Sequence, residues 1–159
     1  MPPAIRTAAV VVTALYLALG TAPAARAELT PWDQAKVTEL AKQLAAATSA
    51  LSDTFRRQPP PTVGSSQRTA FFRLDQEVRH LRRESSSLAR ALERGADRDQ
   101  AQGSFESLME TVRRARDHAR RLFTVAEMQQ RSDAALAILN QLRPYFEADA
   151  VPLEPVRRQ

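Results

Sequence analysis

The sequence predicts an all-α protein, an antiparallel up-and-down four-helix bundle that follows an N-terminal signal peptide. Strong helix formers such as Ala, Leu, Gln, Glu and Arg dominate the 159 residues. Four segments carry apolar residues at alternating steps of three and four, and no segment alternates with period two for long enough to predict a strand. These segments have similar lengths and short connections, which is typical of an antiparallel bundle.

Residues 1–27 have the organisation of a secretory signal peptide. An apolar run at 8–19 follows Arg6, and residues 25–27 (Ala-Arg-Ala) have the small-x-small pattern that signal peptidase accepts. The run is shorter than the roughly 20 apolar residues that cross a bilayer, which favours cleavage after Ala27 over retention as an anchor. We therefore expect a periplasmic or secreted bacterial protein without a transmembrane segment in its mature part. Cleavage would lower the formal net charge from +5 to +3.

The first helix is expected over residues 31–57. Thr30 offers an N-cap hydroxyl, and Pro31 suits the first helical position. Three prolines at 59–61 then end the helix. Its apolar stripe consists of Val37, Leu40, Leu44, Ala47, Leu51 and Phe55.

The second helix is expected over residues 66–94 and the third over residues 98–122. Gly95 suits the left-handed position after a helix end. Asp97 and Gln100 have the spacing of a capping box, and Ser104 is the alternative start because Gly103 weakens the first turn. The second stripe consists of Phe71, Leu74, Val78, Leu81, Ser85, Leu88 and Leu92. The third stripe consists of Phe105, Leu108, Val112, Ala115, Ala119 and Leu122.

The fourth helix is expected over residues 125–147, after a capping box at 124–127 and a hydrophobic staple between Phe123 and Met128. The apolar register slips by one residue at this join, which favours a tight turn over one long helix. Residues 28–148 thus form one helical domain, and residues 149–159 are expected to be a flexible tail. The fourth stripe consists of Val125, Met128, Ser132, Ala135, Leu139 and Leu142.

The composition excludes several kinds of chemistry. The absence of cysteine removes disulfides, thiolate zinc sites and a cysteine nucleophile. His80 and His118 are expected at similar heights on neighbouring helices, but they lie off the apolar stripes and are expected to be solvent or boundary residues. Glu77 and His80 have the E-x-x-H spacing of di-iron bundles, which need two such motifs. We predict no catalytic residue, cofactor or metal ligand, and the chain is not expected to be an enzyme.

Arginines cluster on the second and third helices. The candidate surface for an anionic partner consists of Arg79, Arg82, Arg83, Arg113, Arg116 and Arg120. An exported protein would meet an anionic envelope surface or another envelope protein there, not nucleic acid. The alternative is a solvated face with ion pairs such as Glu110–Arg114, four residues apart. Both a monomer and a homodimer remain compatible with the pattern.

Residues 29–36 (LTPWDQAK) resemble the LTxxQ motif of the periplasmic Spy/CpxP family of helical chaperones and stress sensors. Gln34 lies one position later than in that motif, and the chain has one copy where the family usually carries two. The resemblance implies a holdase-type chaperone or stress accessory. The residues themselves predict an exported, non-enzymatic bundle that binds a partner or has a structural role, and a metal- or haem-binding bundle is the second alternative.

Overall fold

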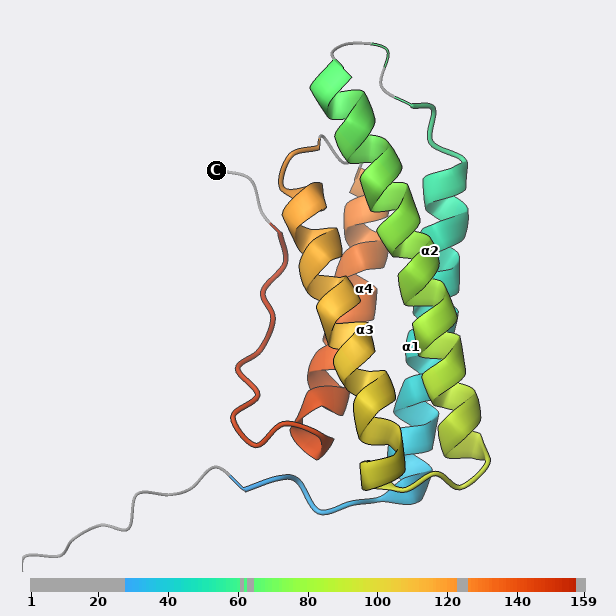
Figure 1. Cartoon of the computed structure of the whole chain (residues 1–159), viewed down its shortest axis with the longest axis vertical. Helices are drawn as coiled ribbons and strands as arrows, with labels where there is room; N and C mark the ends of the chain where they lie inside the picture. Colours follow the sequence, from blue (N-terminus) through green and yellow to red (C-terminus); the bar gives the residue numbers. More distant parts are fainter. Residues whose placement is uncertain (1–27, 61, 63–64, 123–125, 157–159) are drawn as a thin grey trace, which may run out of the picture.

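In the computed structural model, which describes residues 28–60, 62, 65–122 and 126–156, the described chain forms four α-helices and no strand. The helices lie side by side along the long axis of the molecule (Figure 1). Helix α1 packs against α2 and α4, and α2 packs against α3. The all-α class and the bundle arrangement are therefore confirmed. The helices are α1 (Gln34–Arg56), α2 (Ser65–Glu93), α3 (Arg98–Ala119) and α4 (Ala126–Leu142), and a 3-10 turn at Arg143–Tyr145 continues α4.

Three sequence predictions fall outside the described residues. They are the signal peptide at 1–27, the first two residues of the capping box at 124–127, and the staple residue Phe123. Among the helices that the structure does describe, none combines the length and the apolar character needed to cross a membrane.

Helix α1 begins three residues later than expected. Asp33, not Thr30, is the N-cap, and its carboxylate accepts a hydrogen bond from the Lys36 backbone N–H at 3.0 Å. The expectation of a Thr30 cap is therefore wrong. The backbone N–H of Thr30 donates instead to the carbonyl of Pro144 at 2.9 Å, which ties the start of the described chain to the end of α4. Asp ranks above Thr as an N-cap, so the cap lies at the residue with the higher N-cap propensity.

The connection between α2 and α3 agrees with its sequence signals. Asp97 caps α3, and the reciprocal bonds with Gln100 complete a capping box, so the alternative start at Ser104 is wrong. Gly95 has a φ of +89°, the left-handed conformation that glycine adopts without steric cost. Helix α2 ends at Glu93, one residue before the expected end.

The third and fourth helices are both shorter than expected. Helix α3 ends at Ala119 rather than at 122, and α4 begins at Ala126, so the two are separate helices and the prediction of a break is confirmed. Helix α4 ends at Leu142 rather than at 147. Pro144 explains this end, because proline lacks the N–H of the α-helical ladder and fits the 3-10 turn that follows.

The four apolar stripes form the core, as their spacing predicts. Most stripe positions that the structure describes are buried, while Ala47, Phe71, Ala119 and Ser132 are half-buried. The largest fully buried apolar side chains are Phe105, Leu88, Leu92, Leu108, Leu142 and Val37.

One end of the bundle is packed with aromatic rings, and we call it the aromatic end: Trp32, Phe105 and Phe146 with Arg98. The rings of Phe105 and Phe146 stack with centroids 4.3 Å apart, and Trp32 meets Phe146 edge-on at 5.5 Å. The guanidinium of Arg98 lies 5.4 Å from the centre of the Trp32 ring, within cation–π range. These contacts join the start of α1, the start of α3 and the end of α4.

Candidate functional site

An apolar cavity of about 100 Å³ lies inside the bundle, on the side of α3 and α4. All four helices contribute to its wall. Helices α1 and α2 supply leucines and a valine, including Leu51, Leu74 and Val78. Helices α3 and α4 supply Val112, Ala115, Ser132, Ala135 and Leu139, among others.

Small side chains explain why this part of the core is not filled. Ala115 and Ala119 on α3 lie across from Ser132 and Ala135 on α4, and all four line the cavity. Small residues fill the space between helices only where the backbones come close. The backbones of α3 and α4 hardly approach each other, because α3 packs on α2 and α4 packs on α1. The combination of small side chains and separated helices leaves the cavity.

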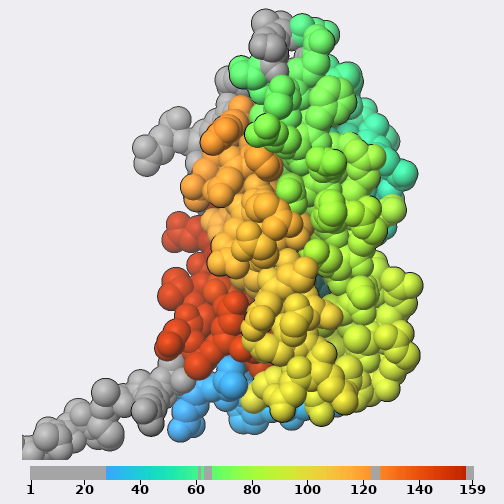
Figure 2. All heavy atoms as spheres, viewed as in Figure 1, coloured from blue at the N-terminus to red at the C-terminus, as the bar shows by residue number. Residues whose placement is uncertain are grey.

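The C-terminal segment, residues 149–156, runs back alongside α3 (Figure 1) and makes contacts with both α3 and α4. Leu153 exchanges two hydrogen bonds with the Asn140 side chain, at 2.8 and 3.0 Å. Arg143 donates to the carbonyl of Val151, and Val156 contributes to the wall of the cavity. Figure 2 shows the red C-terminal residues alongside α3. The sequence predicted a flexible tail here and did not predict these contacts.

Arg116 connects this segment to α3 at the wall of the cavity. Its Nη2 donates to the carbonyl of Glu154 at 2.8 Å. Its Nε is buried and has no hydrogen-bond partner in the part of the chain that the structure describes. None of the ion pairs within the described ranges includes Arg116. Arg116 therefore lines the apolar cavity without a carboxylate partner among the residues that the structure describes.

The other arginines of the candidate anionic-partner surface have different surroundings. Arg79 pairs with Asp75. Arg113 pairs with Glu110 at 2.8 Å, and Arg120 pairs with Asp117 at 3.6 Å. In these three pairs the acidic partner lies three or four residues away on the same helix, as the alternative of a solvated, ion-paired face predicts.

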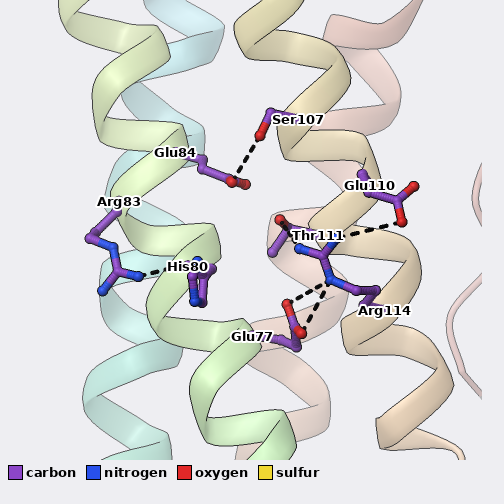
Figure 3. A network of polar contacts seen from close by, with 8 residues as sticks. All are labelled: Glu77, His80, Arg83, Glu84, Ser107, Glu110, Thr111 and Arg114. Atoms are coloured by element: carbon purple, nitrogen blue, oxygen red, sulfur yellow. Dashed lines mark hydrogen bonds and ion pairs between the residues drawn. The ribbon is translucent and has the colours of Figure 1, made fainter.

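Polar side chains between α2 and α3 form a network on the outside of the bundle (Figure 3). Arg114 donates to both oxygens of Glu77 at 3.2 Å and to the hydroxyl of Thr111 at 2.8 Å. Ser107 donates to Glu84 at 3.0 Å. These bonds join the two helices, so they give this face a structural role. Of the six predicted arginines, Arg83 lies at the edge of the network, with Nη2 3.1 Å from Nδ1 of His80.

The two histidines are farther apart along the bundle than the sequence predicts. Glu77 on α2 pairs with Arg114 on α3, so His80 lies opposite residues near Thr111, two helical turns from His118. Similar heights would require a turn centred on residue 99, midway between the two histidines, whereas the chain turns at Gly95. His118 instead shares a surface depression with Arg73 and Arg121. Within the described ranges, no group of three or more His, Asp or Glu could hold a metal ion.

The segment that resembles the LTxxQ motif holds the aromatic end together. The Trp32 indole donates to the Gln34 side chain at 2.9 Å, and the Gln34 amide donates to the carbonyl of Leu92 at 2.9 Å. Arg98 donates to the Thr30 carbonyl at 2.6 Å. These residues therefore connect α1, α2 and α3. Searches against family models, curated proteins and solved structures found no match to this chain.

Proposed function

We propose that this chain is an exported, non-enzymatic bundle that binds an apolar ligand in the cavity between α3 and α4. The cavity carries the proposal, because it is apolar, is lined from all four helices, and is covered by the C-terminal segment instead of by close helix packing. Ligand sites of bundles occur between their helices. Engineered apolar cavities of about 150 Å³ stay dry and bind small apolar molecules.

The antiparallel up-and-down topology belongs to this proposal. Two contacts between α1 and α2 support it: Phe55 meets Phe71 near one end, and Gln34 meets the carbonyl of Leu92 near the other. The pair of Glu77 and Arg114 supports the same relation between α2 and α3 when it is taken with Glu84 and Ser107. The hydrogen bond from Thr30 to Pro144 brings the region before α1 beside the end of α4.

The cavity wall supports binding rather than turnover. Its polar members among the described residues are Thr48, Arg116, Gln129 and Ser132. General acid–base chemistry near neutral pH uses groups such as His, Asp and Glu. The wall residues present instead a surface on which an apolar molecule loses contact with water, which is the main source of binding free energy for such ligands.

Binding of xenon, an apolar atom small enough for a cavity of about 100 Å³, tests the proposal. We expect the xenon NMR signal to shift when the purified protein is added, because the atom leaves water for the cavity. Ala115→Leu fills the cavity and should abolish most of the shift. Ala134→Leu makes the same change at an exposed position of α4 and should leave the shift unchanged. Absence of a shift with the wild type, or equal shifts with the two variants, would contradict the proposal.

Export has a separate test. Expression of the full chain in a bacterial host should yield periplasmic protein whose mass corresponds to a chain beginning at Glu28. Arg6 and the apolar run at 8–19 support this expectation. Protein of full mass that stays in the cytoplasm would exclude it.

A further inference from the structure

Arg116 places an unsatisfied cation at the wall of the apolar cavity. Its Nη2 has the Glu154 carbonyl as an acceptor, and its buried Nε has none among the described residues. A buried donor on a charged group is costly when it lacks an acceptor. The arginines one turn away on each side, Arg113 and Arg120, have carboxylate partners. Arg98 also has a buried Nε without an acceptor among the described residues, but it lies over Trp32 at the aromatic end and does not line the cavity.

A carboxylate is the group that can accept the hydrogen bond for which the Nε of Arg116 has no acceptor among the described residues. Its two oxygens accept parallel hydrogen bonds from two N–H groups of one guanidinium, which a single backbone carbonyl cannot do. We propose that the cavity binds a single-chain amphiphile with a carboxylate head group, namely a fatty acid. This inference rests on the proposed function. The head group binds Arg116, and the alkyl chain lies among the apolar side chains of the wall, such as Leu51, Leu74 and Val78.

The C-terminal segment competes with this ligand for the same place. The carbonyl of Glu154 occupies Nη2 of Arg116, and Val156 lines the cavity. A cavity of about 100 Å³ is too small for a long alkyl chain, since one of about 150 Å³ holds only a molecule the size of benzene. Residues 154–156 therefore leave when the fatty acid enters. Asn140 keeps its two hydrogen bonds to Leu153. Leu153 is therefore the hinge about which residues 154–156 move.

Titration of the purified protein with dodecanoate and dodecanol tests the carboxylate. Isothermal titration calorimetry reports both affinities. We expect dodecanoate to bind about tenfold or more tightly than dodecanol, because a charged hydrogen bond contributes on this scale. Arg116→Gln should remove the difference between the two ligands. Arg113→Gln, a change of the same kind at an exposed position on the same helix, should preserve it.

The outcomes separate this inference from the proposed function. If xenon binds and is blocked by Ala115→Leu, yet dodecanoate and dodecanol bind equally to the wild type, the cavity is a neutral apolar site and the carboxylate inference is wrong. A preference for dodecanoate that survives Arg116→Gln also overturns it. If xenon does not bind at all, both proposals fail together.

A chain that ends at Leu153 as a C-terminal amide tests the competition, since the amide avoids a new carboxylate beside Arg116. Because this variant lacks the Glu154 carbonyl and Val156, we expect it to bind dodecanoate several-fold more tightly than the full chain does. The thermal unfolding midpoint of the two proteins, measured by circular dichroism, checks that the bundle itself is intact. Equal or weaker binding by the shortened chain would overturn the displacement of residues 154–156.

Discussion

The aromatic end and the cavity are built from the same four helices with the same stripe spacing, yet only one of them is filled. At the aromatic end, Phe105 is 0% exposed and stacks on Phe146, so large rings occupy the space between helices. Around the cavity, Ala115 and Ser132 leave about 100 Å³ empty. At about 24 cal/mol per Å³, that void corresponds to roughly 2 kcal/mol of packing that the protein forgoes. Helical periodicity decides which residues face inward, whereas side-chain size decides where a ligand has room.

Truncation of an aromatic ring should have the largest effect. We expect Phe105→Ala to lower the free energy of unfolding by about 3–5 kcal/mol, because the ring is fully buried and its removal opens a cavity. Urea denaturation followed by circular dichroism measures the change. Phe72→Ala is the control, since Phe72 is 54% exposed and should change stability little. Similar losses in both variants would mean that the aromatic end is not the tightly packed region.

Enlarging an alanine should have opposite effects in the two regions. Ala101 is 0% exposed near the start of α3 and does not line the cavity, so Ala101→Leu should overpack the core and cost about 1–3 kcal/mol. Ala115→Leu should instead raise the free energy of unfolding by about 0.5–2 kcal/mol by filling the cavity. Urea denaturation of the two variants measures both changes in the free energy of unfolding. Destabilisation by Ala115→Leu as large as that by Ala101→Leu would show that there is no usable space there.

Loss of the bonds that hold the C-terminal segment should have a smaller effect. Asn140→Ala removes both hydrogen bonds to Leu153, and we expect a loss of about 1 kcal/mol with faster amide exchange at Leu153. Hydrogen exchange followed by NMR measures it. Gln141→Ala is the matched control, because that exposed side chain bonds only to Ala137 in its own helix. Unchanged exchange at Leu153 in the Asn140 variant would show that other contacts hold the segment.

The smallest effect is expected on the arginine-rich face. Arg113→Gln breaks an exposed pair within α3 and should change stability by less than about 0.5 kcal/mol. Arg114→Gln should cost more, about 1 kcal/mol, because its partner Glu77 belongs to α2 and has a side chain only 15% exposed. Thermal unfolding of the two variants side by side measures the difference. Equal values would mean that the network between α2 and α3 contributes no more than an ordinary surface pair.

The sequence was sufficient for the helices and their inner faces. Alternating steps of three and four identify a buried face because the period of an α-helix lies between them, and the described members of the stripes do form the core. Local sequence signals also predicted the connection between α2 and α3. Asp97 and Gln100 form the expected capping box, and Gly95 has the expected left-handed conformation. Local signals failed at the start of α1, where Thr30 and Pro31 suggested a cap three residues too early. Asp33 is the cap, and the backbone N–H of Thr30 bonds to the distant Pro144 instead.

The candidate site was hidden from sequence reasoning for a physical reason. The predicted stripes included the small cavity residues Ala115, Ala119, Ser132 and Ala135. Small residues are found both where helices pack closely and where a cavity is left between them. Only the separation of α3 from α4 decides between them. Arg116 was predicted as one of six surface cations, and its bond to the Glu154 carbonyl depends on a C-terminal segment that the sequence predicts to be flexible. A run of small residues in two neighbouring stripes was the one available signal.

The hydrogen bond from Thr30 to Pro144, together with the packing of α1 on α4, has a consequence for biosynthesis. The first helix to be made finds one of its two neighbours only when the last helix has been made. Contacts between distant parts of a chain form late, because closing the intervening loop has an entropic cost. The bundle therefore cannot close while its C-terminal part is still on the ribosome. A chain that stays open until synthesis is complete is in the state that a secretion channel can thread.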